Sequence, residues 1–401
     1  MKKLLLATTA LAAGGLVAAL PGGPAEAQQK GLQIGLGGYF QAYYIFGDQD
    51  KDGAGQPANS RRSDDFKREA EIHFKGTTTL DNGLTVGIHV ELEAETSADQ
   101  IDESYLFFQG SWGRLILGSE NSAAYLLSVA GRPVDSSFDG ADPNYRIYQP
   151  GGNRAVAGGG TAIFGGGGFV YAPVVSGDSE KVTYISPRWA GFQGGISFTG
   201  DNSEDAAVGQ VNAKGGTFIG MPLDNRVGLT TNAIEFAVNY EGNVAGAKVL
   251  AAVTYGHADV ESRTGNINLD SDFNEFTAGF LVGYAGFDVG FGYYWTDSGL
   301  RSNGDREIFF LSAGYSFGPF RVGVSYTDVS QEAGTTTAVN GTVRDDEFRR
   351  YAFGGTYTYG PGMELRASVQ IHDLDGPDNS ATGTNDRNDS IFFTIGTVVN
   401  F

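Results

Sequence analysis

Ionisable side chains recur at every second position in two neighbouring stretches of the chain, between residues 71 and 93. The stretches are EIHFK and IHVELE. Alternate residues of a β-strand face the same side, so each stretch would present its ionisable groups on one face. Imidazoles and carboxylates gathered in this way can share protons or bind a cation. The residues concerned are Glu71, His73, Lys75, His89, Glu91 and Glu93.

The turn at residues 81–83, DNG, decides which of these groups meet. Both flanking stretches carry apolar side chains at even positions, and a two-residue turn would pair odd positions with even ones. We therefore predict a three-residue loop in which Gly83 takes the left-handed conformation. The predicted pairs are Lys75 with His89, His73 with Glu91, and Glu71 with Glu93.

The predicted pair of Glu71 and Glu93 sets two carboxylates in direct opposition, which is repulsive on a pleated surface. Screening by water explains such a pair without any ligand. A bound Ca²⁺ is the alternative, because hard oxygen ligands are abundant, although no spaced ligand loop is present. We predict no other cofactor.

No pattern typical of a catalytic centre accompanies these residues. None of the four histidines, His73, His89, His257 and His372, lies in a metal-ligand spacing such as H-E-x-x-H. The glycines form no G-x-G-x-x-G that opens a helix, and the absence of Cys removes disulfides, thiolate metal sites and cysteine nucleophiles. We predict that the protein is not an enzyme.

Strands must position the ionisable side chains, and alternation of apolar and polar residues predicts strands along the whole chain. Many segments run to about ten residues, the length with which a tilted strand crosses a bilayer, whereas strands of soluble sandwiches are shorter. Their even number suits a closed bacterial barrel, so we predict an all-β fold, a sixteen-stranded antiparallel transmembrane β-barrel. The segments are 32–46, 67–80, 84–95, 103–111, 113–118, 180–186, 190–199, 233–241, 246–257, 274–284, 287–297, 306–317, 320–329, 348–359, 362–372 and 390–401.

Composition and the first residues indicate an exported β protein. The 401 residues include 61 Gly, 19 Tyr and 27 Phe, which suits strands and turns better than helices. A formal net charge of −20 would repel phosphate backbones, so no nucleic-acid partner is expected. Two lysines, an apolar stretch and an A-x-A site at 25–27 predict a signal peptide over 1–27 and a barrel domain over 28–401. Aromatic residues near strand ends are expected to form interfacial girdles: Tyr39, Tyr43, Tyr44, Tyr293, Tyr294, Trp295, Tyr357 and Tyr359.

One connection is far longer than the others. About sixty residues, 119–179, separate two predicted strands without alternation. Connections this long are usually functional or disordered. Ser122 followed by AAYLL predicts a short helix with a serine cap. Such order favours a segment that folds into the lumen as a constriction over one that lies outside the barrel.

Four segments occur in a specific order: REAEIHFKGTTTLDNGLTVGIHVELEAE, GRLILGSENSA, KVTYISPRWAGFQGGISF and the terminal strand ending in Phe401. In this the chain resembles the Gram-negative general porins of the alphaproteobacterial type. The resemblance implies a homotrimeric outer-membrane channel whose third outer loop folds into the pore, with acidic residues on that loop facing a basic wall. The candidate constriction acids are Glu120, Asp135, Asp139 and Asp142, and the candidate bases are Lys75, Arg114, Arg321 and Arg366. Simple solvation of a polar lumen is the alternative for each of them.

These expectations point to passive diffusion of small hydrophilic solutes and ions through a water-filled channel. Opposed charges across a lumen would orient dipolar solutes and give a mild charge preference. The alternatives are a channel selective for sugars, phosphate or peptides, an outer-membrane barrel enzyme, and a secreted β adhesin. The expected surroundings are outer-membrane lipid and lipopolysaccharide.

The last predicted strand ends on Phe401. It must pair with the first strand, near 32–46, because an open edge cannot survive in the hydrocarbon region. Its apolar series at 391, 393, 395, 399 and 401 would then face lipid. The resemblance implies that the terminal Phe is the signal read by the outer-membrane assembly machinery.

Overall fold

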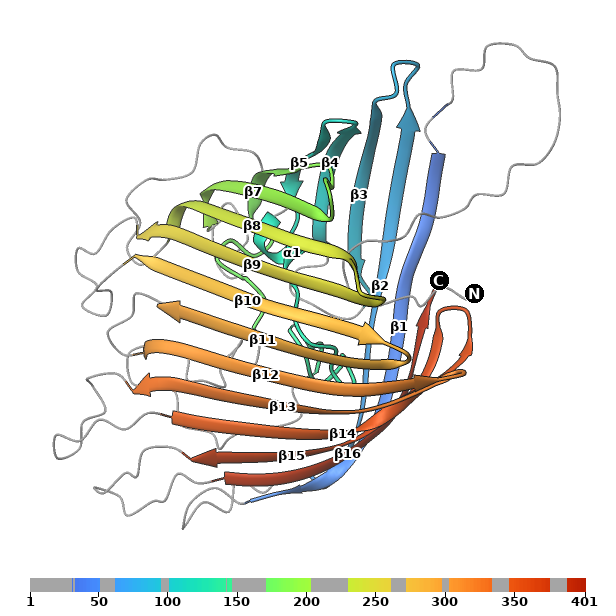
Figure 1. Ribbon diagram of the computed structural model, residues 1–401, viewed down its shortest axis with the longest axis vertical. Helices are drawn as coiled ribbons and strands as arrows, with labels where there is room; N and C mark the ends of the chain where they lie inside the picture. Colours follow the sequence, from blue (N-terminus) through green and yellow to red (C-terminus); the bar gives the residue numbers. More distant parts are fainter. Residues whose placement is uncertain are drawn as a thin grey trace.

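The structure, a computed structural model, is a closed antiparallel barrel of sixteen strands, with one short helix among the residues that it describes (Figure 1). It describes residues 31, 33–50, 62–94, 101–141, 143–145, 171–202, 230–260, 272–297, 303–333, 346–375 and 388–401. The elements are β1 (Gln33–Gln49), β2 (Asp64–Thr79), β3 (Thr85–Glu93), β4 (Ile101–Gly110), β5 (Gly113–Ser119), α1 (Ala123–Leu127), β6 (Glu180–Ile185), β7 (Phe192–Asp201), β8 (Thr230–Val244), β9 (Ala247–Val260), β10 (Phe273–Tyr284), β11 (Phe287–Asp297), β12 (Asn303–Phe317), β13 (Phe320–Ala333), β14 (Asp346–Gly360), β15 (Met363–Asp375) and β16 (Asn388–Asn400). Each of the sixteen predicted segments overlaps one strand, which confirms the predicted fold. The predicted signal peptide, 1–27, and Asp142 lie outside the described residues.

The barrel closes where β1 pairs with β16, as predicted. Tyr44 lies opposite Ile395 in this ladder. At its end the N–H of Phe401 donates to the carbonyl of Gly38, and the N–H of Gly38 donates to the carbonyl of Phe401, both at 3.1 Å. The C-terminus therefore takes part in the sheet, and pairing of the first and last strands leaves no open edge in lipid.

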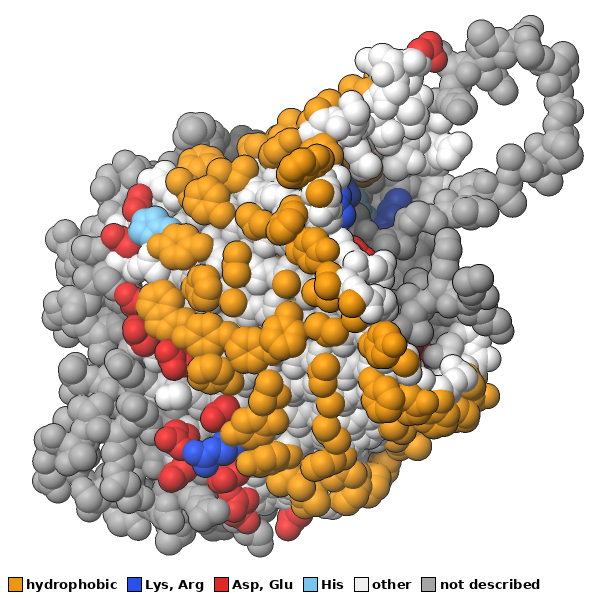
Figure 2. Space-filling model, in the orientation of Figure 1, with side chains coloured by type: hydrophobic (Ala, Val, Ile, Leu, Met, Phe, Trp, Pro, Cys, Tyr) orange, Lys and Arg blue, Asp and Glu red, His pale blue; other side chains and the backbone are white. Residues whose placement is uncertain are grey.

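The two faces of the sheet differ in polarity, as a membrane barrel requires. Hydrophobic side chains cover much of the outer face that Figure 2 shows. Phe280, Phe309 and Phe353 on outward positions of the strands are each more than two-fifths exposed. On the inner face hydroxyls pair with one another, as Thr254 and Thr277 do at 2.6 Å. No helix among the described residues is long and apolar enough to cross a membrane.

Tight turns connect neighbouring strands at one end of the barrel (Figure 1). Between β10 and β11, Ala285 and Gly286 both have positive φ, 49° and 89°, which matches the primed turns that suit twisted hairpins. Between β2 and β3 the N–H of Leu80 donates to the carbonyl of Leu84 at 2.8 Å, and Gly83 has a φ of 83°. The predicted three-residue loop is therefore confirmed.

The expected interfacial girdle is wrong for Tyr39, Tyr43 and Tyr294, whose side chains point into the barrel. The inward hydroxyls find carboxylate acceptors there: Tyr43 donates to Asp135 at 3.1 Å, and Tyr294 donates to Glu275 at 3.0 Å. Tyr43 and Tyr294 are almost completely buried. Whether an aromatic residue near a strand end faces lipid or the lumen thus depends on whether its position in the strand is odd or even.

Candidate functional site

The segment after β5 runs along the inner wall of the barrel. Its helix α1 packs against β7, β8 and β9, and the Ser122 hydroxyl accepts a hydrogen bond from the N–H of Tyr125 at 3.3 Å, so the predicted capped helix is confirmed. Beyond the helix the loop backbone lies directly on the sheet. A Cβ added at Gly279 of β10 would stand 1.9 Å from the carbonyl oxygen of Val129. Because Gly279 has no side chain, the loop backbone can contact the wall at this point.

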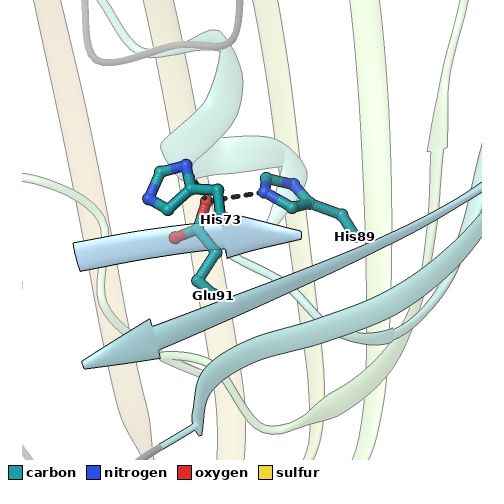
Figure 3. Close-up of side chains that lie close together, drawn as sticks. All are labelled: His73, His89 and Glu91. Atoms are coloured by element: carbon teal, nitrogen blue, oxygen red, sulfur yellow. Dashed lines mark ion pairs between the residues drawn. The ribbon is translucent and has the colours of Figure 1, made fainter. Parts of the chain in front are cut away.

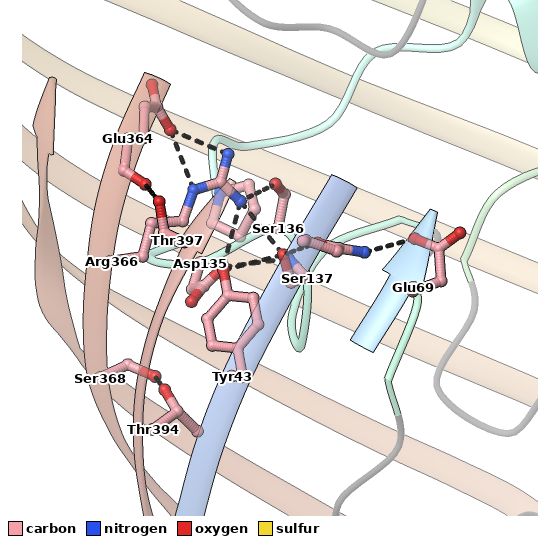
Figure 4. Close-up of polar contacts among 12 residues, drawn as sticks. Tyr43, Glu69, Asp135, Ser136, Ser137, Glu364, Arg366, Ser368, Thr394 and Thr397 are labelled. Carbon is pink, nitrogen blue, oxygen red and sulfur yellow. Dashed lines mark hydrogen bonds and ion pairs between the residues drawn. The ribbon is translucent and has the colours of Figure 1, made fainter. Parts of the chain in front are cut away.

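Asp135 is held against β1 and β15 (Figure 4). Its Oδ1 lies 3.2 Å from Nη1 of Arg366 and accepts the Tyr43 hydroxyl at 3.1 Å. Arg366 also reaches the hydroxyl of Ser137 at 3.2 Å and the carboxylate of Glu364 at 2.9 Å. The structure thus brings together two of the predicted constriction residues, Asp135 and Arg366, in direct contact.

Asp139 is bound by an arginine that the sequence analysis did not select. Its carboxylate forms an ion pair with Arg350 of β14 and accepts a hydrogen bond from Ser325 of β13. Arg350 also donates to the carbonyl of Phe138 at 3.0 Å. Asp139 is 1% exposed and Arg350 is 3% exposed. The parity of β14 could have revealed Arg350, because Phe353 on the same strand faces outward.

Arg321 of β13 holds the loop through its backbone. It pairs with Asp288 of β11 at 2.7 Å and donates to the carbonyls of Arg132 and Pro133 at 3.2 and 3.0 Å. Burial lowers the pKa of the Arg132 guanidinium, and the like charge of Arg321 lowers it further. Three arginines of the wall therefore bind the loop that lies over them: Arg321 and Arg366, which were predicted, and Arg350, which was not.

The returning part of the loop, residues 171–179, lies against a stretch of the wall that carries glutamates instead of arginines. The N–H of Val174 donates to both oxygens of Glu275 at 3.1 and 3.0 Å, and the Ser176 hydroxyl donates to Glu235. Both glutamates are about 99% buried. The outgoing part of the loop thus places aspartates beside arginines of the wall, whereas the returning part places hydrogen-bond donors beside glutamates of the wall.

Glu120 lies at the root of the loop rather than over the lumen, with 3% of its surface exposed. Its carboxylate accepts the N–H of Asn121 at 3.1 Å, and its backbone carbonyl accepts Lys181 at 2.5 Å. Burial raises the pKa of the Glu120 carboxyl, and the nearby charge of Glu91 raises it further.

The remaining predicted bases lie on the stretch of wall formed by β2–β5. Lys75 stands opposite His89 in the β2–β3 ladder, as predicted, and both its side chain and that of Arg114 are partly exposed. The guanidinium of Arg114 stands 4.2 Å from the ring centre of Phe107, a cation–π contact. Neither base forms an ion pair with Asp135 or Asp139, the described acids farther along the loop, whereas Arg114 is near enough to Glu120 to lower the pKa of its carboxyl.

The other predicted pairs of the β2–β3 hairpin are also confirmed, with His73 opposite Glu91 and Glu71 opposite Glu93. Two groups of possible metal ligands follow from this register: His73, His89 and Glu91 (Figure 3), and Glu69, Glu71 and Glu93. Glu69, which the sequence analysis did not select, accepts the Tyr39 hydroxyl at 2.7 Å. Glu69 lies two residues before Glu71 and therefore on the same face of β2. The expected Ca²⁺ at the opposed carboxylates stays a prediction.

Comparison with known proteins agrees with this architecture. The family model described as Gram-negative porin matches residues 7–396. An uncharacterised protein of Rickettsia bellii (strain RML369-C) is 23% identical over 386 residues, covering 90% of this chain and 84% of that protein.

Solved structures share the fold. An anion-selective porin from Comamonas acidovorans has a TM-score of 0.56 at 14% identity, covering 92% of this chain and all of that one. OmpF of Salmonella typhi in complex with daunomycin has a TM-score of 0.57 at 16% identity, covering 92% of this chain and 97% of that one. The trimer form of OmpT of Vibrio cholerae has a TM-score of 0.56 at 13% identity, covering 92% and 99%. With the family match over nearly the whole chain, the protein belongs to the Gram-negative porin family and forms an outer-membrane channel for the passive diffusion of small solutes.

Proposed function

We propose that the chain is a diffusion channel with a mild preference for cations, narrowed by the loop 119–179, whose described residues are packed against the inner wall. The observation that carries this is the unequal distribution of charge. The loop acids Asp135 and Asp139 are compensated by Arg366 and Arg350 directly behind them. Between residues 69 and 114 the inward-facing described carboxylates outnumber the bases: Glu69, Glu71, Glu91, Glu93 and Glu103 against Lys75 and Arg114.

The candidate constriction residues divide into two roles under this proposal. Asp135, Asp139, Arg321 and Arg366 hold the loop in place, and Asp142 belongs to the same acidic stretch of the sequence. Lys75, Arg114 and the glutamates of β2 and β3 set the field that a passing ion meets. A carboxylate-rich wall attracts cations and repels anions, whereas the charges buried under the loop act mainly on its position.

Current through planar bilayers tests this proposal. Detergent-purified protein should give stepwise conductance. In a KCl gradient its reversal potential should lie nearer the equilibrium potential of K⁺ than that of Cl⁻. The Glu71→Gln/Glu93→Gln variant should move that potential toward chloride, while Glu241→Gln, at an exposed pair with Lys248, should leave it unchanged. Absence of current steps would contradict the channel itself. Chloride-favouring current from the unaltered protein would contradict only the cation preference.

We also propose that the protein has no enzymatic activity. A serine and a histidine do meet on the inner wall, where Nδ1 of His372 lies 2.9 Å from the Ser390 hydroxyl. Both are buried, and the rings of Phe348 and Phe392 stand 5.7 and 5.9 Å from the imidazole. Because both groups are buried beside these rings, a substrate in the lumen does not reach the pair. The rate of ester hydrolysis measured on the reconstituted barrel should therefore be the same for Ser390→Ala and for the unaltered protein.

Finally, we propose a homotrimer embedded in lipid and lipopolysaccharide, with a signal peptide over 1–27 that is removed before barrel assembly. The trimer is supported by the trimer form of the structurally similar OmpT. Mass measurement of the detergent complex, with N-terminal sequencing of the purified protein, tests both proposals. A monomeric complex would contradict the first, and an N-terminus at residue 1 the second.

A further inference from the structure

Two imidazoles and one carboxylate converge on a single point of the inner wall of β2 and β3 (Figure 3). Oε1 of Glu91 lies 3.3 Å from Nδ1 of His73 and 3.0 Å from Nε2 of His89. All three ligand atoms lie within 4.8 Å of one another. His89 is 2% exposed, whereas the side chains of His73 and Glu91 are 16% and 12% exposed, so the point is reached from the lumen.

Neighbouring groups fix which ring nitrogens face this point. Nε2 of His73 lies 2.8 Å from Glu71, which only accepts, so that nitrogen carries a proton and Nδ1 presents its lone pair when the ring is neutral. Nδ1 of His89 lies 2.6 Å from the hydroxyl of Tyr105. When His89 donates from Nδ1 to this hydroxyl, its Nε2 presents a lone pair to the point shared with Glu91.

With both rings neutral in these tautomers, two lone pairs meet the carboxylate of Glu91, and the repulsion is relieved when a proton or a metal ion lies between them. Nε2 of His89 is buried and makes no well-aligned hydrogen bond, although Oε1 of Glu91 lies 3.0 Å from it. A tetrahedral ion about 2.0–2.1 Å from each ligand holds its ligand atoms roughly 3.3 Å apart, close to the separations found here. We propose that His73, His89 and Glu91 bind a divalent first-row transition metal of the Zn²⁺ type, with the fourth position open to the lumen.

The surrounding hydrogen bonds resemble those of established metal centres, in which a ligating histidine donates its second N–H to a carboxylate or another acceptor. Glu71 and Tyr105 fill this role for His73 and His89. Imidazole nitrogens favour Zn²⁺, Cu²⁺ and Ni²⁺ over Ca²⁺. The site is thus chemically distinct from the opposed carboxylates of Glu71 and Glu93, where only oxygen ligands are present. A bound dication would reduce the cation preference that we propose for this wall.

Cobalt absorption tests the site directly, using the full-length folded barrel in detergent without a histidine tag. Co²⁺ should give saturable visible bands of a tetrahedral complex at one ion per chain, and Zn²⁺ should remove them. His73→Gln and His89→Gln should abolish the bands. Tyr105→Phe keeps every ligand and should weaken binding about 10–100-fold. His257→Gln, at an exposed histidine paired with Asp259, should bind as the unaltered protein does.

Circular dichroism confirms that each variant retains its strands before binding is measured. Absence of saturable Co²⁺ bands, or equal binding by the unaltered protein and His89→Gln, would overturn the proposal. The effect on selectivity rests on the proposed function, so it is measured separately: Zn²⁺ should shift the reversal potential toward chloride in the unaltered protein and not in His89→Gln. Failure of metal binding leaves the metal-free conductance intact, so the two proposals are distinguished.

Discussion

Replacing Arg350 by Ala should release the middle of the loop from the wall. The substitution removes the guanidinium that pairs with Asp139 and supports the carbonyl of Phe138. Asp139 would remain 1% exposed beneath the loop without its cation. Asp135 and Arg366 would still hold the neighbouring residues, so we expect a local opening rather than collapse of the barrel.

The expected cost follows from the burial of the pair. Removing one partner of a buried ion pair costs about 3–5 kcal/mol. Asp139 keeps the hydroxyl of Ser325 as a donor, so we expect the lower end, about 3 kcal/mol, which is roughly a hundredfold in the population of the detached loop. The neighbouring Arg349 offers a matched control, because it faces the other way and forms partly exposed pairs with Glu347 and Asp373. Such surface pairs contribute about 0–1 kcal/mol.

Single-channel recording and limited proteolysis measure the opening. Arg350→Ala should show a larger or noisier current and faster cleavage within the loop, while Arg349→Ala should show neither. Asp139→Ala/Arg350→Met removes both charges and should resemble the unaltered protein more closely than either single change does. Equal behaviour of Arg350→Ala and Arg349→Ala would refute the reasoning.

Gly279→Ala sets a Cβ 1.9 Å from the carbonyl oxygen of Val129 and should displace the loop, seen as altered conductance. Gly283→Ala on the same strand face sets its Cβ 3.8 Å from the carbonyl oxygen of Phe287, an ordinary contact, and should not. Deleting Phe401 removes two closing hydrogen bonds and should reduce the yield of folded barrels far more than the conductance of those that form. For Glu120 the folded pKa lies above the unfolded value near 4.5, so its stabilising contribution is complete below that pH and is lost as pH rises through the folded pKa. Glu120→Gln should remove this part of the pH dependence, measured by urea unfolding between pH 4 and pH 9; an unchanged profile would contradict the assignment.

The strands and their local register could be predicted because they depend on neighbours in sequence. Alternation marks which residues face lipid, and a turn of known length then fixes the pairing across a hairpin. The pair of His73 and Glu91 followed from the parity around the DNG turn alone. The same logic applied to the closure of the barrel, because lipid tolerates no open edge and only one strand was left for β1.

The partners of the loop could not be predicted in this way. Asp139 and Arg350 are 211 residues apart, and no periodicity relates a loop residue to the strand that it will meet. Parity indicates that Arg350 faces inward, and likewise Glu235 and Glu275, but several inward charges are available to each acid. The choice is made by the path of the backbone, which depends on space left at glycines such as Gly279 and Gly290.

The distribution of these contacts separates two properties that a channel must combine. The shape of the lumen depends on ion pairs buried between loop and wall, such as Asp139 with Arg350, which salt screens weakly. The ionic preference depends on groups of β2 and β3 that are partly exposed to the lumen, such as Glu91, which salt screens more than the pairs buried under the loop. Raising the salt concentration should therefore weaken selectivity while the loop keeps its position. A change in Arg350 should alter conductance without a matching change in selectivity, because its charge lies beneath the loop and outside the path of the ions.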